Sequence, residues 1–131
     1  MPRKMTSAYE LEEELVTKCH RGVCELRDTW GIGIHGERLN QRRADKSGSD
    51  RGSPDYLLCV SGWHHPLEFK RRGDGRFSLD QMVAAERRRA AGIETYAPTS
   101  TAQFDALVRW SRKYFKGVCP DCPTVPEVSR P

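Results

Sequence analysis

The sequence predicts an α/β fold in which a mixed sheet is flanked by helices. Three segments carry apolar residues at helical spacing, and each begins with a helix-capping pattern. Short apolar runs bounded by glycine, serine or proline lie between these segments, as expected for strands. The chain has 131 residues and is 37% hydrophobic, which suits one modest core. We therefore expect one folded domain over residues 1–117. The tail, residues 118–131, is rich in proline and poor in large apolar residues, so we expect it to be extended or held by something other than the core.

The first predicted element is a helix over about residues 8–20. Ser7 and Glu10 have the spacing of a capping box, in which two side chains pair with backbone N–H groups of the first turn. An apolar stripe follows at helical spacing, and Gly22 ends it. The stripe consists of Leu11, Leu15, Val16 and Cys19.

The middle of the chain predicts three strands. The first covers Val23–Trp30, where apolar residues alternate loosely, and a polar loop follows over Arg38–Ser53. The second is the apolar run Tyr56–Val60, and the third is Pro66–Lys70. Ser61-Gly62 suits the turn between them, so these two strands should form a hairpin.

A helix, a strand and a last helix are predicted after the hairpin. Ser78-Leu79-Asp80-Gln81 is a capping box ahead of a helix that ends at Gly92, and Ile93–Ala97 suits a fourth strand. Because a helix separates the third and fourth strands, a right-handed crossover should bring them together as a parallel pair. Ser100-Thr101-Ala102-Gln103 is a further capping box. The last helix then has an inner face made of Phe104, Leu107, Val108, Ser111, Tyr114 and Phe115.

Two carboxylates and one ammonium group are expected to meet on the predicted hairpin. Asp55 begins one strand and Glu68 lies in its neighbour, while Lys70 shares a face with Glu68 because it is two residues further along the strand. Carboxylate oxygens are ligands that Mg²⁺ prefers, and the backbone carbonyl of Phe69 is a further candidate ligand. Mg²⁺ activates water for phosphodiester hydrolysis, and an ammonium group can orient that water. The alternative is that Glu68 and Lys70 form a solvated ion pair.

Four short motifs that contain these residues resemble one known family. They are Gly52-Ser53-Pro54-Asp55-Tyr56-Leu57-Leu58, Leu67-Glu68-Phe69-Lys70, Ser78-Leu79-Asp80-Gln81 and Ala90-Ala91-Gly92-Ile93. Over roughly Tyr9 to Trp110 the chain resembles the VRR-NUC nucleases of the PD-(D/E)xK superfamily. The resemblance implies a restriction-endonuclease-like core with the order α-β-β-β-α-β, and it makes residues 1–117 a nuclease domain.

The resemblance implies two further active-site residues. A glutamine at the position of Gln81 lies close to the active site in the family, whereas the capping box gives the same side chain a structural role, and both roles stay open. The family usually adds an acidic residue from the first helix. Among the glutamates of that helix, Glu12 falls on the apolar stripe, three and four positions before Leu15 and Val16. Glu12 is therefore the expected additional metal ligand.

The activity that the resemblance implies is Mg²⁺-dependent endonucleolytic cleavage of DNA, with Mn²⁺ as a substitute. Asp55, Glu68, Glu12 and the Phe69 carbonyl would bind the metal, and Lys70 would orient water or stabilise charge. Stand-alone members of this size resemble Holliday-junction resolvases, so branched DNA and a homodimer are expected. Two alternatives remain: a flap, nicking or nonspecific DNA nuclease, and a non-catalytic, zinc-stabilised module that binds nucleic acid.

The charge pattern permits a polyanionic partner. The net charge is +4, and basic residues gather in Arg38–Arg51, Lys70–Arg76 and Arg87–Arg89. These runs can neutralise a phosphate backbone or can simply be solvated. The sequence has no apolar stretch of membrane-spanning length, and its first residues lack the apolar core of a signal peptide. We therefore expect a cytoplasmic protein without membrane contact.

The cysteines leave a structural zinc site open. Cys119 and Cys122 have the spacing of a zinc knuckle, and Cys19 with Cys24 could supply a second pair. Cys19 and Cys24 also fit the predicted core as small apolar residues, and we favour this interpretation, which applies to Cys59 as well.

The histidines are assigned no catalytic role. His64 and His65 fall in the predicted hairpin turn, where exposed histidines are common, and His35 lies in a glycine-rich segment with no partner identifiable from the sequence. We expect these side chains at the surface.

Overall fold

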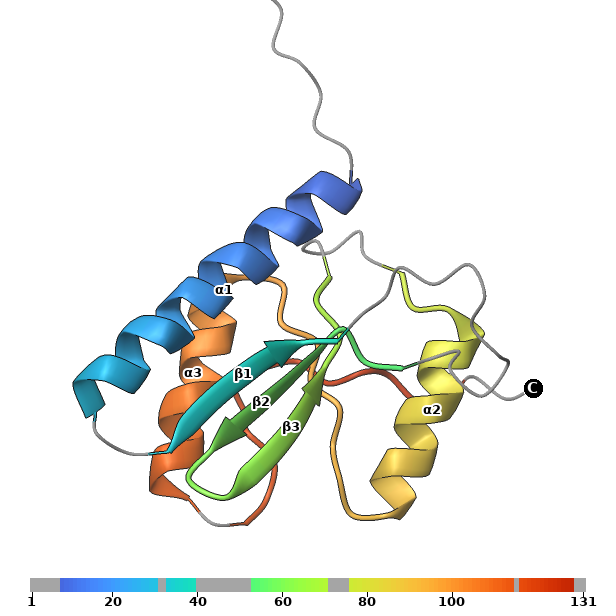
Figure 1. Ribbon diagram of the computed structural model, residues 1–131. Coiled ribbons are helices and arrows are strands. Elements are labelled where there is room, and N and C mark those ends of the chain that lie inside the picture. Colours follow the sequence, from blue (N-terminus) through green and yellow to red (C-terminus); the bar gives the residue numbers. More distant parts are fainter. Residues whose placement is uncertain (1–7, 31–32, 40–52, 71–75, 115, 129–131) are drawn as a thin grey trace, which may run out of the picture.

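The structure is a computed structural model, which describes residues 8–30, 33–39, 53–70, 76–114 and 116–128. Within these ranges the fold is mixed α/β, with three helices and one three-stranded antiparallel sheet (Figure 1). In chain order the elements are α1 (Ala8–Trp30), β1 (Ile34–Arg38), β2 (Tyr56–Val60), β3 (Trp63–Leu67), α2 (Leu79–Ala90) and α3 (Thr101–Lys113).

The sheet has the strand order β1-β2-β3, and α1 and α3 cover one of its faces (Figure 1). The predicted hairpin of β2 and β3 is confirmed. Its turn residues Ser61 and Gly62 have φ values of 50° and 93°, as a type I′ turn requires. Strand β3 differs from the prediction, because it begins at Trp63 and ends at Leu67 instead of covering Pro66–Lys70.

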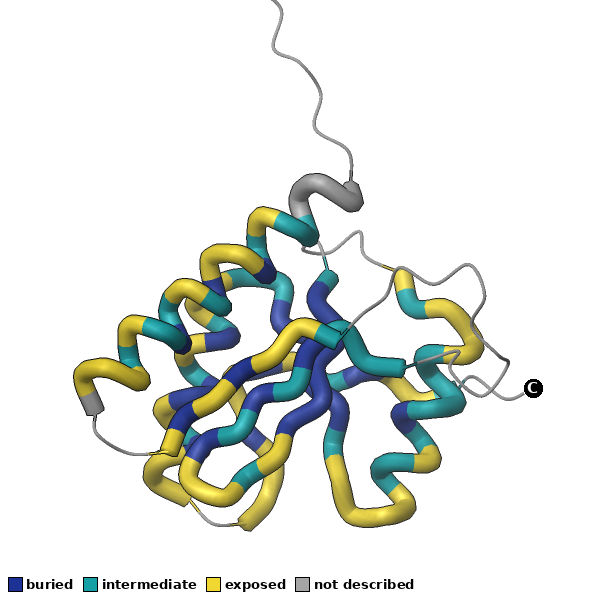
Figure 2. The backbone as a smooth tube through the Cα atoms, in the orientation of Figure 1, coloured by how far each residue is buried: buried dark blue, intermediate teal, exposed yellow. Residues whose placement is uncertain are grey.

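Helix α1 continues through Gly22 to Trp30, so the predicted helix end and the predicted strand Val23–Trp30 are wrong. Figure 2 shows buried positions recurring along α1 with exposed positions between them. Burial of a valine is worth about 1.5–3 kcal/mol, which exceeds the cost of about 1 kcal/mol for a glycine inside a helix. The apolar stripe therefore extends past the glycine, and its buried or partly buried members are Leu15, Val16, Cys19, Val23 and Leu26.

The first strand, β1, lies in a glycine-rich segment for which the sequence predicted no strand. Ile34 and Gly36 are buried while His35 between them is exposed, which is the alternation of a strand with one covered face. Gly36 lies against Tyr56, whose hydroxyl group is 2.7 Å from Nδ1 of His20. A Cβ atom at position 36 would overlap that hydroxyl group, so the tyrosine requires glycine here.

Substitution of this glycine should destabilise the protein. We expect Gly36→Ala to lower the free energy of unfolding by about 1–3 kcal/mol, because the added methyl group displaces the buried Tyr56 ring. Gly33→Ala is the matched control, since a Cβ atom there meets no atom within 4 Å. Urea denaturation of both variants measures the difference. Equal stability of the two variants would contradict the role of Gly36.

The second and third capping boxes mark helix starts, as predicted. Ser78 Oγ accepts a hydrogen bond from the Gln81 N–H at 3.1 Å, and Gln81 Oε1 accepts one from the Ser78 N–H at 2.9 Å. Ser100 caps α3 by accepting a hydrogen bond from the Gln103 N–H at 3.2 Å. The Gln103 amide oxygen differs from the prediction, because it accepts the backbone N–H of Thr99 at 2.6 Å instead of the N–H of the cap.

The predicted parallel pairing is present as a single bridge between Leu67 and Tyr96. The Tyr96 N–H donates to the Pro66 carbonyl at 3.1 Å, and the Tyr96 carbonyl accepts the Glu68 N–H at 2.8 Å. The segment Ile93–Ala97 is thus not a regular strand, but it runs beside the end of β3 in the predicted direction. It thereby fixes the backbone of Glu68.

The described part of the tail, residues 118–128, is extended beside Tyr96, as expected, but it also packs into the core, which the sequence did not predict. Cys119, Cys122 and Val125 are buried. Thr124 forms an antiparallel bridge with Tyr96, and the backbone of residues 123–125 bonds to that of residues 95–97 on either side of the bridge. The tail therefore acts as an additional extended segment beside Tyr96.

The core lies between the sheet and the helices α1 and α3. Tyr56 occupies its centre, with its ring edge-on to Phe69 at 5.6 Å and to Phe104 at 6.3 Å between centroids. In the described part of the chain, no helix combines the length and the apolar character needed to cross a bilayer.

Several sequence predictions lie outside the described residues. These are the first capping residue, Ser7, the side chain of Phe115, most of the polar loop Arg38–Ser53 and most of the basic run Lys70–Arg76. The inner face of the last helix is confirmed up to Ser111, whereas Tyr114 follows the helix and is exposed.

Candidate active site

The two predicted carboxylates lie side by side at one end of the β2–β3 hairpin. Asp55 directly precedes β2 and Glu68 directly follows β3. The Asp55 N–H donates to Glu68 Oε1 at 3.1 Å and to the Leu67 carbonyl at 2.9 Å. In return, the carboxylate of Asp55 accepts a hydrogen bond from the backbone N–H of Phe69. These reciprocal hydrogen bonds fix both acidic side chains relative to the hairpin.

Glu68 is the buried centre of this cluster. Its side chain is fully buried, and among the described residues its Oε2 atom has no hydrogen-bond partner. Burial and then the nearby Asp55 raise the pKa of Glu68 to about 8, and burial raises the pKa of Asp55 to about 6 despite the charge of Lys70. A buried polar atom without a partner costs about 1–3 kcal/mol. A divalent cation bound here would offset that cost and would favour the ionised form of both carboxyl groups.

Lys70 and Gln81 are in direct contact. Lys70 Nζ donates to Gln81 Oε1 at 3.2 Å and lies 5.0 Å from the centroid of the Phe77 ring. The same Gln81 oxygen accepts the backbone N–H of Ser78. One oxygen thus caps the helix and contacts Lys70, so the two positions are compatible, and a catalytic role for Gln81 stays a prediction. Lys70, whose charge lowers the pKa values of Asp55 and Glu68, is thus held by the first turn of α2.

The charge state of residue 81 should therefore control the lysine. We expect Gln81→Glu to keep the helix cap but to bind Lys70 in an ion pair, so that any activity depending on a free ammonium group falls about 10-fold. Gln103→Glu is the matched control, since Gln103 holds the same position in α3 but its side-chain oxygen bonds to Thr99 and not to Lys70. Unfolding assays on both variants test whether the helix cap is kept. Assays of DNA cleavage, the activity that the sequence predicts, test the effect on the lysine. An unchanged cleavage rate in Gln81→Glu would contradict this role.

Glu12 approaches the site from α1. Its side chain is half-buried, and its charge raises the pKa of Asp55, as does the charge of Glu13. Glu13 pairs with Arg38 at the end of β1. Glu14 is exposed. The structure thus brings the predicted helix residue near Asp55, and metal binding by Glu12 stays a prediction.

Phe69 separates the two functional side chains of its segment. Its ring is buried and stacks on Phe104 at 6.0 Å between centroids, while Glu68 and Lys70 face the site. This is the alternation that the sequence predicts. The Phe69 N–H orients Asp55, and metal binding by its carbonyl stays a prediction.

Arg88 belongs to the site, although the sequence did not single it out. Its Nε donates to Thr95 Oγ1 at 2.8 Å, and its charge lowers the pKa of Glu68. Arg88 lies seven positions after Gln81, so both fall on one face of α2, and this spacing could have revealed it. The run Arg87–Arg89 is therefore not one solvated patch. Arg89 instead forms an ion pair with Glu94 at 2.9 Å.

The cysteines separate into different environments. Cys19, Cys119 and Cys122 are buried in the same core, where burial and then the neighbouring Cys119 and Cys19 raise the pKa of Cys122. Cys24 is half-buried, with Sγ 3.9 Å from Nε2 of His20. Among the described residues no three His, Cys, Asp or Glu side chains are already grouped around a metal position. A zinc site at these cysteines stays a prediction.

His65 is a core residue, which corrects the expectation of an exposed turn. It lies in β3, is buried, and its Nε2 is 2.8 Å from Ser111 Oγ. Burial lowers the pKa of His65 to about 4, so the ring is neutral near pH 7. His64 and His35 are exposed, as expected.

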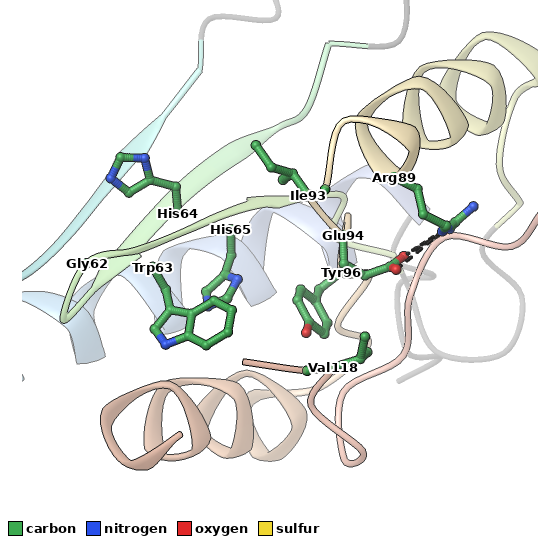
Figure 3. Close-up of a pocket in the computed structure, with 11 residues that line it drawn as sticks. Gly62, Trp63, His64, His65, Arg89, Ile93, Glu94, Tyr96 and Val118 are labelled. Carbon is green, nitrogen blue, oxygen red and sulfur yellow. Dashed lines mark hydrogen bonds and ion pairs between the residues drawn. The ribbon is translucent and has the colours of Figure 1, made fainter. Parts of the chain in front are cut away.

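A cavity of about 390 Å³ lies at the opposite end of β3 from Glu68 (Figure 3). Its lining combines apolar and aromatic side chains, among them Trp63, Ile93 and Tyr96, with two histidines and the ion pair of Arg89 and Glu94. In the described part of the chain, the candidate site residues are not among those lining it. This cavity and the carboxylate cluster are thus separate features.

No family model, curated protein or solved structure matches this chain. The function proposed below is supported by the geometry of Asp55, Glu68 and Lys70 and by the motifs that contain them.

Proposed function

We propose that this protein is a metal-dependent nuclease that hydrolyses phosphodiester bonds in DNA, with Mg²⁺ as its cofactor and Mn²⁺ as a substitute. The observation that supports this proposal most strongly concerns Glu68, which forms a cluster with Asp55 and Lys70. Its Oε2 atom is buried and has no hydrogen-bond partner among the described residues. A buried acid beside a second acid and a cation is unusual as a structural feature, because each charge costs free energy to bury.

The donor set fits Mg²⁺. Asp55 and Glu68 offer carboxylate oxygens, which are hard ligands, and Mg²⁺ is usually bound by one or two carboxylates with water and substrate phosphate completing the shell. Glu12 and the Phe69 carbonyl are the further proposed ligands. Burial, and then Asp55, keep the pKa of Glu68 raised although Lys70 and Arg88 both lower it, and a divalent cation at the site would stabilise the ionised carboxylate.

Three residues of this chain would act directly on the reaction. When bound, the metal would lower the pKa of a water molecule and offset charge on the phosphorane-like transition state. Lys70 would orient the attacking water or stabilise the negative charge on the phosphate, because its ammonium group is held by Gln81 beside both carboxylates. Asp55 and Glu68 would hold their positions through the hydrogen bond between them.

The order of elements supports a restriction-endonuclease-like core of the PD-(D/E)xK type. The described elements run α1, β1, β2, β3 and α2, and the segment at Tyr96 then pairs in parallel with Leu67. This is the order α-β-β-β-α-β of the VRR-NUC nucleases, with the last strand reduced to one bridge. The motifs quoted above fall on matching elements, with Asp55 entering β2 and Gln81 beginning α2.

Branched DNA is the proposed substrate. The VRR-NUC resemblance extends to Holliday-junction resolvases, in which two active sites cut symmetrically related strands. A homodimer with two-fold symmetry would place two copies of the Asp55–Glu68 site on such a junction. The net charge of +4 is compatible with a DNA partner.

A cleavage assay tests both parts of the proposal. The purified chain is incubated with Mg²⁺ or Mn²⁺ on four-way junction, flap, single-stranded and duplex DNA, beside Asp55→Asn as the inactive control. We expect metal-dependent cleavage that is lost in Asp55→Asn and is fastest on the junction. If duplex and junction are cut equally well, the substrate proposal fails and the nuclease proposal survives. If no DNA is cut with either metal, the nuclease proposal fails.

A further inference from the structure

The three strands place two histidines and a cysteine in one row across the sheet. His35 on β1 is the direct partner of Cys59 on β2, and Cys59 is the direct partner of His64 on β3. Directly opposed residues in neighbouring strands have side chains on the same face. Glu37 lies on that face as well, two residues after His35 on β1.

Among the described residues no helix packs on this face, which we call the open face. Helices α1 and α3 cover the other face (Figure 1). Ile34, Leu58 and His65, which alternate with the row residues along their strands, are buried. The side chains of His35 and Glu37 are 57% and 54% exposed, and His64 is exposed as well. In Figure 3 the ring of His64 points away from the side occupied by Trp63 and His65.

We propose that His35, Cys59 and His64, with Glu37 as the fourth ligand, form a binding site for a divalent transition-metal ion of the Zn²⁺ class. Imidazole nitrogen and thiolate sulfur are the ligands that Zn²⁺ and Co²⁺ take in preference to Mg²⁺. Four ligands of these types suit tetrahedral coordination.

The spacing of the sheet supports this site. Neighbouring strands lie about 4.8 Å apart, so the two histidines flank Cys59 at about 5 Å on either side. A Zn²⁺ ion about 2.3 Å from the sulfur would lie above the middle strand, between the two imidazole rings. In the described part of the chain the ligands do not already converge. Binding therefore requires the two exposed imidazoles to turn towards the thiol, which involves no buried group.

Glu37 lies near two of the other three groups. His35 Nε2 lies 3.8 Å from Glu37 Oε1. The charge of Glu37 adds to burial in raising the pKa of Cys59, so this carboxylate lies near the thiol as well as near the ring. On binding, the thiol would release its proton to solvent as the metal–sulfur bond forms, and no oxidation is involved.

The site is distinct from the carboxylate cluster. Cys59 lies four residues after Asp55, and His64 four residues before Glu68, so the two sites are separated by about 13 Å along the strands. A metal in the row would link β1 to the hairpin and would stabilise the sheet.

Titration with Co²⁺ tests the proposal, because a thiolate ligand gives a sulfur-to-cobalt charge-transfer band and tetrahedral coordination gives strong visible bands. We expect one equivalent of Co²⁺ to produce both in the wild-type chain. We expect Cys59→Ser to abolish the charge-transfer band, and the double variant His35→Gln, His64→Gln to weaken binding at least about 100-fold. Cys24→Ser is the matched control and should leave the spectrum unchanged, as should Glu68→Gln.

Three outcomes would overturn the site. They are the absence of a charge-transfer band in the wild type, its persistence in Cys59→Ser, and its loss in Cys24→Ser. Because the substituted row residues lie on the open face, metal-free variants should keep the wild-type thermal midpoint. Zn²⁺ should raise that midpoint in the wild type and not in the double variant, and equal shifts in the two proteins would count against the proposal.

Discussion

Replacing Glu68 by glutamine is expected to stabilise the metal-free protein above neutral pH and to abolish its response to Mg²⁺. The substitution keeps the size of the side chain and the oxygen that accepts the Asp55 N–H. It removes the negative charge that burial and Asp55 both oppose. We expect Glu68→Gln to be more stable than the wild type by about 1–3 kcal/mol near pH 8 without metal, and to lose cleavage entirely.

The pH dependence has a definite sign. The pKa of Glu68 is raised in the folded protein to about 8 from an ordinary value of 4.5. The folded wild type therefore binds a proton at Glu68 more tightly than the unfolded chain does. Without metal, the contribution of Glu68 to the free energy of unfolding is fully present below about pH 4.5 and is lost as the pH rises through about 8. Glutamine cannot ionise, so the advantage of the variant should grow across the same window.

The contribution of His65 to stability has the opposite pH dependence, and it must be separated from that of Glu68. Its pKa is lowered from 6.5 to about 4, so its contribution is present above about pH 6.5 and is lost as the pH falls through about 4. Asp55, with a pKa raised to about 6, is mostly ionised by about pH 7. The change in the free energy of unfolding between about pH 7 and about pH 8 therefore reports mainly on Glu68. His65 contributes equally in the variant and in the wild type, so its contribution drops out of the difference between them.

Chemical denaturation with and without Mg²⁺ measures both effects. A ligand at 100 times its dissociation constant stabilises the folded state by about 2.7 kcal/mol. We expect Mg²⁺ to stabilise the wild type, more strongly at pH 8 than at pH 6, and to leave Glu68→Gln unchanged. Glu86→Gln is the control, since that glutamate lies on α2 and accepts the Val128 N–H away from the site. A Mg²⁺ response that survives in Glu68→Gln would refute the metal assignment.

The fold was predictable where side-chain patterns act locally. The capping box at Ser78, the N-cap at Ser100 and the turn at Ser61-Gly62 specify hydrogen bonds or φ values within a few residues, and these predictions are confirmed. The other half of the box at Ser100 is not formed, because the Gln103 side chain bonds to Thr99. The end of α1 was not predictable from Gly22, because burial of Val23 against the sheet offsets the cost of glycine, and that burial depends on distant residues.

The arrangement of the site was predictable only in part, for the same physical reason. Asp55, Glu68 and Lys70 follow from the alternation of a hairpin, which the sequence carries directly. The place of Arg88 near Glu68 requires the packing of α2 against the segment at Thr95. Packing of the tail likewise depends on backbone pairing with Tyr96 and not on a stripe of large apolar residues.

Replacing Lys70 by methionine should reduce cleavage about 100- to 1,000-fold while the fold is retained. Methionine keeps an unbranched side chain against the Phe77 ring and removes the ammonium group held by Gln81. The loss follows because that cation is the group placed to stabilise negative charge beside Asp55 and Glu68. Lys113→Met is the matched control, since Lys113 also lies over an aromatic ring, that of Tyr114, but away from the site.

The pH profile of the residual activity distinguishes a catalytic lysine from a structural one. Lys70 lowers the pKa values of both Asp55 and Glu68, so its removal should raise them further. More of the carboxyl pair then stays protonated at a given pH, and metal binding requires a higher pH. Residual cleavage by Lys70→Met should therefore shift to higher pH, with the unfolding free energy near that of Lys113→Met. Full activity with an unshifted profile would show that Lys70 does not act on the reaction.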